Sequence, residues 1–177
     1  MNDVSIQDVT SGYRERMRRL ALFEPLYELD RMQQKDSNRK PIPMRDFGLL
    51  TLLFFFENKL MRNQKVGTQD LAKFLESMTA TDFALSRDDY EQIARKLITT
   101  FRPSYGKKRE TTFFNWETKK EESVQFSYLR DNDFSRGVQY YTLDEDGLEL
   151  VFATREFYSE FQLSIHQLML RKQIEKG

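Results

Sequence analysis

The segment FGLLTLLFFFENKL, residues 47–60, restricts the fold of this chain more than any other feature. In the ten consecutive positions 47–56, only Gly48 and Thr51 are not clearly apolar. A surface helix of a globular domain keeps one apolar stripe, so a helix that is apolar around most of its circumference must be covered on several sides. The run ends at Glu57, well short of the roughly 20 residues that a bilayer requires. The sequence therefore predicts a helix with more than one neighbour, not a membrane span.

Composition restricts the class of protein and the kinds of site. At 177 residues the chain is long enough for one ordinary domain with an appendage. Its 28 basic and 28 acidic residues balance, so any contact with DNA has to be local. The sequence has no cysteine, which excludes disulfides, thiolate metal sites and thiol nucleophiles. Residues 1–20 lack the basic and then apolar order of a signal peptide, so we expect a cytoplasmic protein.

Residues 1–43 are predicted to form an N-terminal helical extension followed by a linker. Apolar side chains recur at helical spacing at Val9, Tyr13, Met17 and Leu20, and Pro25 is typical of the first turn of a second helix. The segment KDSNRKPIP, residues 35–43, is polar and contains two prolines, which indicates a linker.

A domain over residues 44–144 is predicted from three helices and three strands. The helices are expected at 44–61, 68–78 and 87–101, with Thr68 and Ser86 as N-caps. The apolar face of the third helix is Tyr90, Ile93, Ala94, Leu97 and Phe101. The segments TTFFNWE (111–117) and SVQFSYLR (123–130) have strand character and form a predicted hairpin, DNDFSRG (131–137) is expected to be a loop, and VQYYTL (138–143) is a third strand. This order predicts an α+β, mostly α fold with a winged helix-turn-helix domain in which the hairpin forms the wing.

Residues 145–177 are predicted to be dominated by one long helix, from Glu145 to Lys176, which at roughly 1.5 Å per residue would be near 48 Å long. Two apolar stripes run along it: Val151, Tyr158, Phe161, Ile165 and Leu168 in one, and Leu163, Leu170 and Ile174 in the other. Two stripes indicate two neighbours. We expect this helix to begin a helical bundle whose other members come from downstream sequence, another chain or residues 5–34, and the chain to be the N-terminal part of a longer protein.

The sequence offers no set of residues for catalysis, a cofactor or a metal. His166 is the only histidine and has no partner ligand. The segment 131–142 begins like a calcium loop, but Arg136 stands where the loop needs glycine and Thr142 where it needs glutamate. The carboxylates of 144–147 are explained by the first turn of a helix. We therefore expect a protein that is not an enzyme and has no cofactor.

Five basic residues are candidates for DNA contact: Lys107, Lys108, Arg109, Lys119 and Lys120. The alternative is a solvated hairpin, since Glu110, Glu117, Glu121 and Glu122 lie among them. The third helix begins with the acidic residues Asp88, Asp89 and Glu91. A helix that reads DNA approaches the bases with this end, so the acidic start weakens the prediction of a transcription factor.

Residues 140–168, YYTLDEDGLELVFATREFYSEFQLSIHQL, carry a motif that spans a strand, a turn and a long helix. The strand ends in tyrosine, one residue and leucine, a glycine lies in the turn, and the helix contains arginine, glutamate and phenylalanine, then leucine and serine. The positions are Tyr141, Leu143, Gly147, Arg155, Glu156, Phe157, Leu163 and Ser164. In this motif the chain resembles kleisin subunits of the MukF type. The stretch 155–177 is similar to the JetA-type kleisins of Wadjet plasmid-defence systems, while residues 1–43 lie outside the MukF pattern.

The resemblance implies a non-enzymatic kleisin subunit of a condensin-like SMC complex that extrudes DNA loops, in plasmid defence or in chromosome organisation. It implies that the winged helix forms a homodimer, that the helices after it dock on the coiled-coil neck of an SMC ATPase, that segments downstream bind kite subunits, and that the complex works on the nucleoid. DNA contact would be indirect or through the wing. The alternative is a DNA-binding winged-helix transcriptional regulator.

These implications select candidate interface residues. The dimer interface is expected on the 47–60 helix, at Phe47, Leu50, Phe54 and Phe55. The surface for the SMC neck is expected on the long helix, at Tyr158, Phe161, Ile165 and Leu168.

Overall fold

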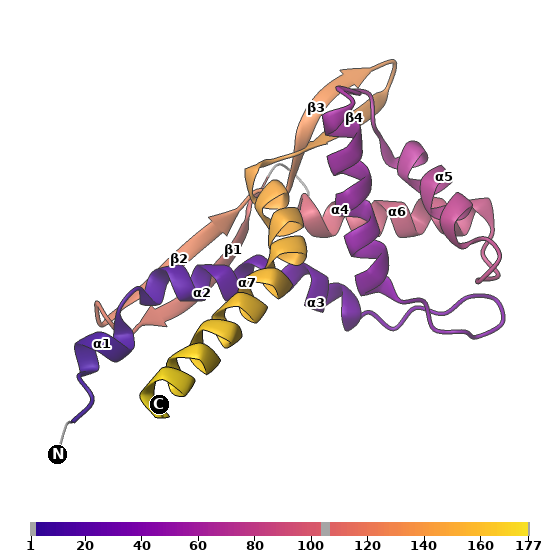
Figure 1. Ribbon diagram of the computed structural model, residues 1–177. Coiled ribbons are helices and arrows are strands. Elements are labelled where there is room, and N and C mark those ends of the chain that lie inside the picture. Colours follow the sequence, from indigo (N-terminus) through magenta and orange to yellow (C-terminus); the bar gives the residue numbers. More distant parts are fainter. Residues whose placement is uncertain (1–2, 104–106, 177) are drawn as a thin grey trace.

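The computed structural model describes residues 3–103 and 107–176, and the side chains of these residues outside 156–164, 173 and 175–176 (Figure 1). The described part is α+β and mostly helical, as predicted. Its helices are α1 (Ile6–Thr10), α2 (Tyr13–Leu22), α3 (Glu24–Asp30), α4 (Met44–Leu60), α5 (Thr68–Thr79), α6 (Arg87–Phe101) and α7 (Glu145–Lys176). Its strands are β1 (Arg109–Asn115), β2 (Lys120–Phe126), β3 (Leu129–Ser135) and β4 (Val138–Leu143).

The three helices predicted after residue 43 are confirmed, as is the buried apolar face of α6. Ser86 caps α6: its Oγ accepts the amide proton of Asp89 at 3.1 Å, and the Asp89 carboxylate accepts that of Ser86 at 2.9 Å. The predicted cap at Thr68 is wrong. Thr68 is already helical, and Gly67 is the cap residue, with its N–H donating to the carboxylate of Asp70 at 2.8 Å.

Two separate antiparallel hairpins replace the single hairpin and third strand that were predicted. The expected loop at 131–137 is instead most of β3 and the turn into β4. Aspartate and asparagine are poor strand formers, which explains the wrong prediction. Arg136 and Gly137 both have positive φ, 53° and 76°, as the two central residues of a tight type I′ hairpin turn require.

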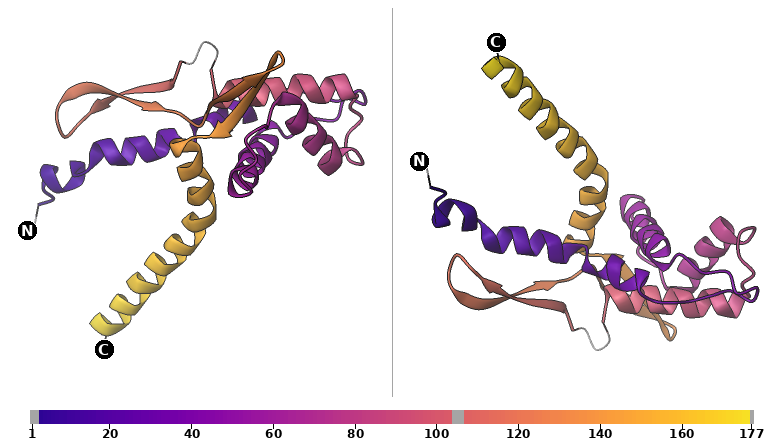
Figure 2. Two further views of the ribbon diagram at one scale, coloured as in Figure 1. Left: turned by 90° about the horizontal axis from the view of Figure 1, so that it is seen from above. Right: turned by 90° about the horizontal axis from the view of Figure 1, so that it is seen from below.

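The hairpin β1–β2 packs mainly on the N-terminal extension. Figures 1 and 2 show it running beside α1 and α2. The Arg14 guanidinium donates to Glu122 at 2.7 Å and to the carbonyl of Ser123 at 3.1 Å, and the Thr111 hydroxyl donates to Glu24 at 2.8 Å. The extension and this hairpin therefore form one arm.

The hairpin β3–β4 instead pairs with the short segment between α4 and α5. Gly67 forms a bridge with Tyr140, and the carbonyl of Val66 accepts the amide proton of Tyr141 at 2.8 Å. A Cβ on residue 67 would lie 3.0 Å from the carbonyl oxygen of Gln139, so glycine allows this close pairing. The pairing fixes β3–β4 at one end of α4.

One core joins the extension to the rest of the chain. Leu22, Leu26 and Leu29, from α2 and α3, are at most 7% exposed and belong to the same apolar cluster as the buried side of α4. The predicted linker is anchored as well, because the buried Asp36 carboxylate accepts amide protons from Asn38, Lys40 and Ala84, each at 2.9 Å or less. These bonds, that of Ala84 first, lower the pKa of Asp36.

Helix α7 begins against the core and then projects away from it. Gly147, Leu150 and Val151 are buried, whereas the described side chains from Ile165 onward are exposed. Figure 2 shows that α7 diverges from the α1–α2 arm. Among the described residues, no helix has both the length and the apolar character that crossing a membrane demands.

Candidate protein-interaction surfaces

Helix α4 has three apolar sides, and two of them are covered within the chain. Phe47, Leu52 and Phe55 are at most 1% exposed and lie in the core. On a second side the ring of Phe54 stacks on Phe74 of α5, with centroids 4.6 Å apart.

The third side of α4 is an apolar stripe that this chain covers only in part. We define the α4 stripe as Leu49, Leu53, Phe56 and Leu60, which follow the spacing of four, three and four residues that aligns side chains along a helix. Leu53 is 37% exposed and Leu60 is 62% exposed. Only Phe56 has an aromatic partner, Phe152 of α7, whose ring lies edge-on at 5.8 Å. Phe152 itself is 42% exposed and extends the stripe onto α7.

The residues predicted for the dimer interface lie on the two covered sides. Phe47 and Phe55 are 1% exposed, so they cannot meet a second copy in this structure. Leu50 and Phe54 are half-buried against the core. Sequence reasoning missed the α4 stripe because nearly every position of the helix is apolar and periodicity does not separate its sides.

The end of α7 carries a second exposed apolar surface. We define the α7 end patch as Ile165, Leu168, Met169, Leu170 and Ile174, which are 38–71% exposed. Ile165 and Leu168 were predicted as an interface, and both are available to a partner. The other two predicted residues, Tyr158 and Phe161, lie outside the described side chains. The patch occupies more than one side of the helix, in keeping with the two predicted stripes.

Arg18 of α2 holds the base of α7. Its guanidinium donates to Glu149 at 2.8 and 2.9 Å and to Asp146 at 2.8 Å, and it lies over the ring of Phe126 at 5.4 Å. The bond to Arg18 lowers the pKa of Glu149, and the bond to Glu149 raises that of Arg18. The extension therefore fixes the direction in which α7 leaves the core.

The five predicted DNA-contact residues do not form one surface. Arg109 is engaged within the chain, with Glu28 and, at 3.0 Å, with the carbonyl of Thr100. Lys119 and Lys120 are at the tip of β1–β2, and the Lys119 ammonium lies 4.7 Å from the ring centroid of Trp116. Lys107 and Lys108 line a pocket at the opposite end of that hairpin.

The carboxylates of the calcium-like segment are used in the fold. Asp131 pairs with Arg102 at 2.6 Å, and Asp133 accepts the amide proton of Phe134 at 2.8 Å. Within the described residues no group of three or more histidine or acidic side chains is placed to hold a metal ion. His166 is exposed on α7.

Comparison of the chain with protein-family models, with curated proteins and with solved structures gave no match. What the chain does has therefore to be inferred from its surfaces and from the motif in residues 140–168.

Proposed function

We propose that this chain is the N-terminal part of a kleisin subunit of an SMC-type complex, with a role in plasmid defence or chromosome organisation. It acts as a scaffold: one surface joins two copies and another docks on the coiled-coil neck of the ATPase. The observation that carries the proposal is the α7 end patch, because a helix that leaves its core with exposed leucine, isoleucine and methionine side chains suits packing against other helices.

The arrangement of α4, α5 and α6 with β3–β4 supports a winged helix within the proposal. In that fold, a short strand between the first two helices pairs with the hairpin that forms the wing. The bond from the Tyr141 amide to the Val66 carbonyl has this pattern. The wing is then β3–β4, and β1–β2 is an insertion that packs on the N-terminal extension.

The α4 stripe supports the homodimer. Leu53 and Leu60 lie on the same side of α4 and are 37% and 62% exposed, and Phe152 of α7 extends their surface. This apolar surface can pack on an identical surface of a second copy about a two-fold axis. The dimer contact is thereby assigned to Leu53, Phe56 and Leu60 instead of the buried phenylalanines.

Docking on the SMC neck is assigned to Ile165 and Leu168. Replacing both with glutamate puts charge into the proposed interface, where burial without a partner is costly. Both side chains are exposed in the chain alone, so the variant keeps its fold.

The proposal predicts that a coiled-coil ATPase is encoded beside this chain, and the test is co-purification with the head and neck of that ATPase. The wild-type chain is expected to bind, and I165E/L168E is expected to lose binding while its melting temperature is unchanged. The matched control is L20E, a leucine on α2 that is 68% exposed, which should bind like wild type. Absence of a coiled-coil ATPase gene nearby, or retained binding by the double variant, would contradict the proposal.

A DNA-binding transcriptional regulator receives less support. Asp88 and Asp89 lie in the first turn of α6, and Asp89 also caps it, so the end of the helix that would approach bases is acidic. The discriminating measurement is a gel shift with duplex DNA at several salt concentrations. Scaffold function predicts no shift that depends on Lys119 and Lys120.

A further inference from the structure

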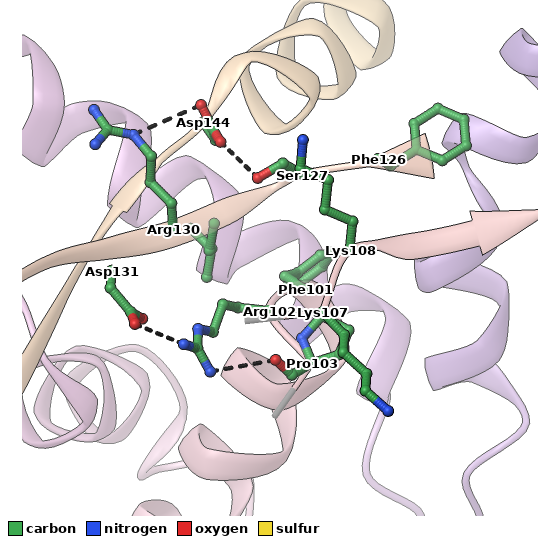
Figure 3. Close-up of a pocket in the computed structure, with 11 residues that line it drawn as sticks. Phe101, Arg102, Pro103, Lys107, Lys108, Phe126, Ser127, Arg130, Asp131 and Asp144 are labelled. Carbon is green, nitrogen blue, oxygen red and sulfur yellow. Dashed lines mark hydrogen bonds and ion pairs between the residues drawn. The ribbon is translucent and has the colours of Figure 1, made fainter. Parts of the chain in front are cut away.

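A pocket of about 240 Å³ lies where the end of α6 meets the starts of β1 and β3 (Figure 3). Four cationic side chains line it, and they come from three segments of the chain: Arg102, Lys107, Lys108 and Arg130. Two carboxylates, Asp131 and Asp144, are also in the lining. Of these four residues, only Lys107 and Lys108 were candidates for anion contact from the sequence. Arg102 and Arg130 join them because the fold brings their segments to the same pocket.

Each of the two arginines forms an ion pair with one of the carboxylates. Arg102 donates to Asp131 at 2.6 Å and to the carbonyl of Pro103 at 3.2 Å. Arg130 lies 3.6 Å from Asp144, whose second oxygen already accepts the Ser127 hydroxyl. Neither lysine has an ion pair among the described residues, and both are exposed. The pocket therefore combines two guanidinium groups that are paired with carboxylates and two lysines that carry no ion pair among the described residues.

The charge of the lining favours an anion with two charges. Four cations against two carboxylates leave two positive charges. The C-terminal end of α6 opposes this with roughly half a negative charge, which is smaller. A phosphate monoester carries about −1.5 to −2 charges near pH 7, whereas each phosphodiester of a nucleic-acid backbone carries one.

The size and walls of the pocket restrict what is attached to the phosphate. Its volume is below the roughly 300–1,000 Å³ of sites for larger organic ligands. Phe101, Phe126 and Leu129 supply apolar wall beside the cations. A phosphate with one compact group such as a sugar fits both properties.

We propose that this pocket binds a phosphate monoester, carried either by a free nucleotide or by the terminal phosphate of a nucleic-acid strand. Guanidinium groups bind phosphate oxygens in a bidentate manner, and lysines add point charges. This site is independent of the α4 stripe and the α7 end patch, so it can be correct or wrong without affecting the scaffold proposal.

Isothermal titration of the whole chain tests the proposal with four probes: inorganic phosphate, a nucleoside 5′-monophosphate, and one oligonucleotide with and without a 5′-phosphate. Saturable binding is expected for the probes with a monoester or free phosphate. Tighter binding of the phosphorylated strand than of the mononucleotide assigns the strand end as the source, and equal binding assigns the free nucleotide. Equal binding of both oligonucleotides overturns the proposal, as does no binding of any probe at millimolar concentration.

Matched charge reversals locate the site. K107E/K108E is expected to lower affinity at least tenfold, and K119E/K120E, the same change at the far tip of the hairpin, less than twofold. Equal losses in the two variants would mean that general surface charge binds the probes and would overturn the proposal. All four lysines are exposed, and K107Q/K108Q repeats the test with a smaller loss if the reversal disturbs folding.

Discussion

Gly147, in the first turn of α7, lies against the carbonyl group of Tyr128: a Cβ at position 147 would come within 2.3 Å of that oxygen. The same oxygen accepts the amide proton of Asp144 at 2.8 Å, so it cannot move without loss of that bond. The glycine thus sets how closely α7 starts against the core. Gly147 is also one of the positions of the motif in residues 140–168. The close approach of α7 to Tyr128 explains why this position requires glycine.

The first prediction concerns this glycine. G147A is expected to destabilise the chain by about 2 kcal/mol. The clash is with backbone, so the overpacking cost should be near the upper end of the usual range of about 1–3 kcal/mol, from which a gain in helix propensity of about 1 kcal/mol is subtracted. G48A is the control, since its Cβ would lie 2.5 Å from the end of the Leu29 side chain, which can rotate. Urea unfolding should rank G147A as the less stable variant. The opposite order would show that the start of α7 can shift freely.

The second prediction concerns Arg18. R18M keeps the aliphatic stem over Phe126 but removes the bonds to Asp146 and Glu149, and we expect it to cost about 1–2 kcal/mol after allowance for solvent screening. R14M, which breaks a more exposed pair with Glu122, should cost less. Hydrogen exchange in the first turns of α7 provides the second measurement. Faster exchange there in R18M alone is expected, and equal exchange in both variants would contradict the role of Arg18.

The third prediction is a pH dependence centred on Asp36. Its pKa is lowered in the folded chain, so its contribution to stability is complete above the unfolded value of about 3.9 and is lost as the pH falls through the folded value. D36N should have a lower melting temperature than wild type at pH 7, because an amide nitrogen cannot accept the proton of Ala84 N–H. As the pH falls through the folded pKa of Asp36, the two proteins should melt at closer temperatures. A constant difference across this range would mean that the carboxylate charge is irrelevant.

Some parts of the fold were predictable from sequence because they depend on local pattern. The face of α6 and its Ser86 cap follow from spacing within one helix, and both are confirmed. The position of β1–β2 was not predictable, since it depends on contacts such as that of Arg14 with Glu122, which are 108 residues apart. Strand β3 was missed because its aspartates suggested a loop, although Arg136–Gly137 is a recognisable turn signal.

For the candidate surfaces too, some features were predictable from the sequence and others were not. The exposure of Ile165 and Leu168 was predictable because a helix that outlasts its domain must leave apolar positions uncovered. Which side of α4 stays exposed was not predictable, because an evenly apolar helix gives no sign of which side the chain itself covers. Only the packing of Phe54 on Phe74 and the burial of Phe55 show that the free side is the α4 stripe.

The last prediction follows from that side of α4. Wild-type chain is expected to be dimeric at micromolar concentration by light scattering, and L53E/L60E is expected to be monomeric, because unpaired carboxylates oppose burial at an apolar contact. The two leucines are 37% and 62% exposed within one chain, so the variant should keep its melting behaviour at low concentration. L20E, equally apolar and 68% exposed on α2, is the control and should stay dimeric. A monomeric wild-type chain, or a dimer that survives L53E/L60E, would remove the α4 stripe from the proposed assembly, because Phe47 and Phe55 are buried and cannot take its place.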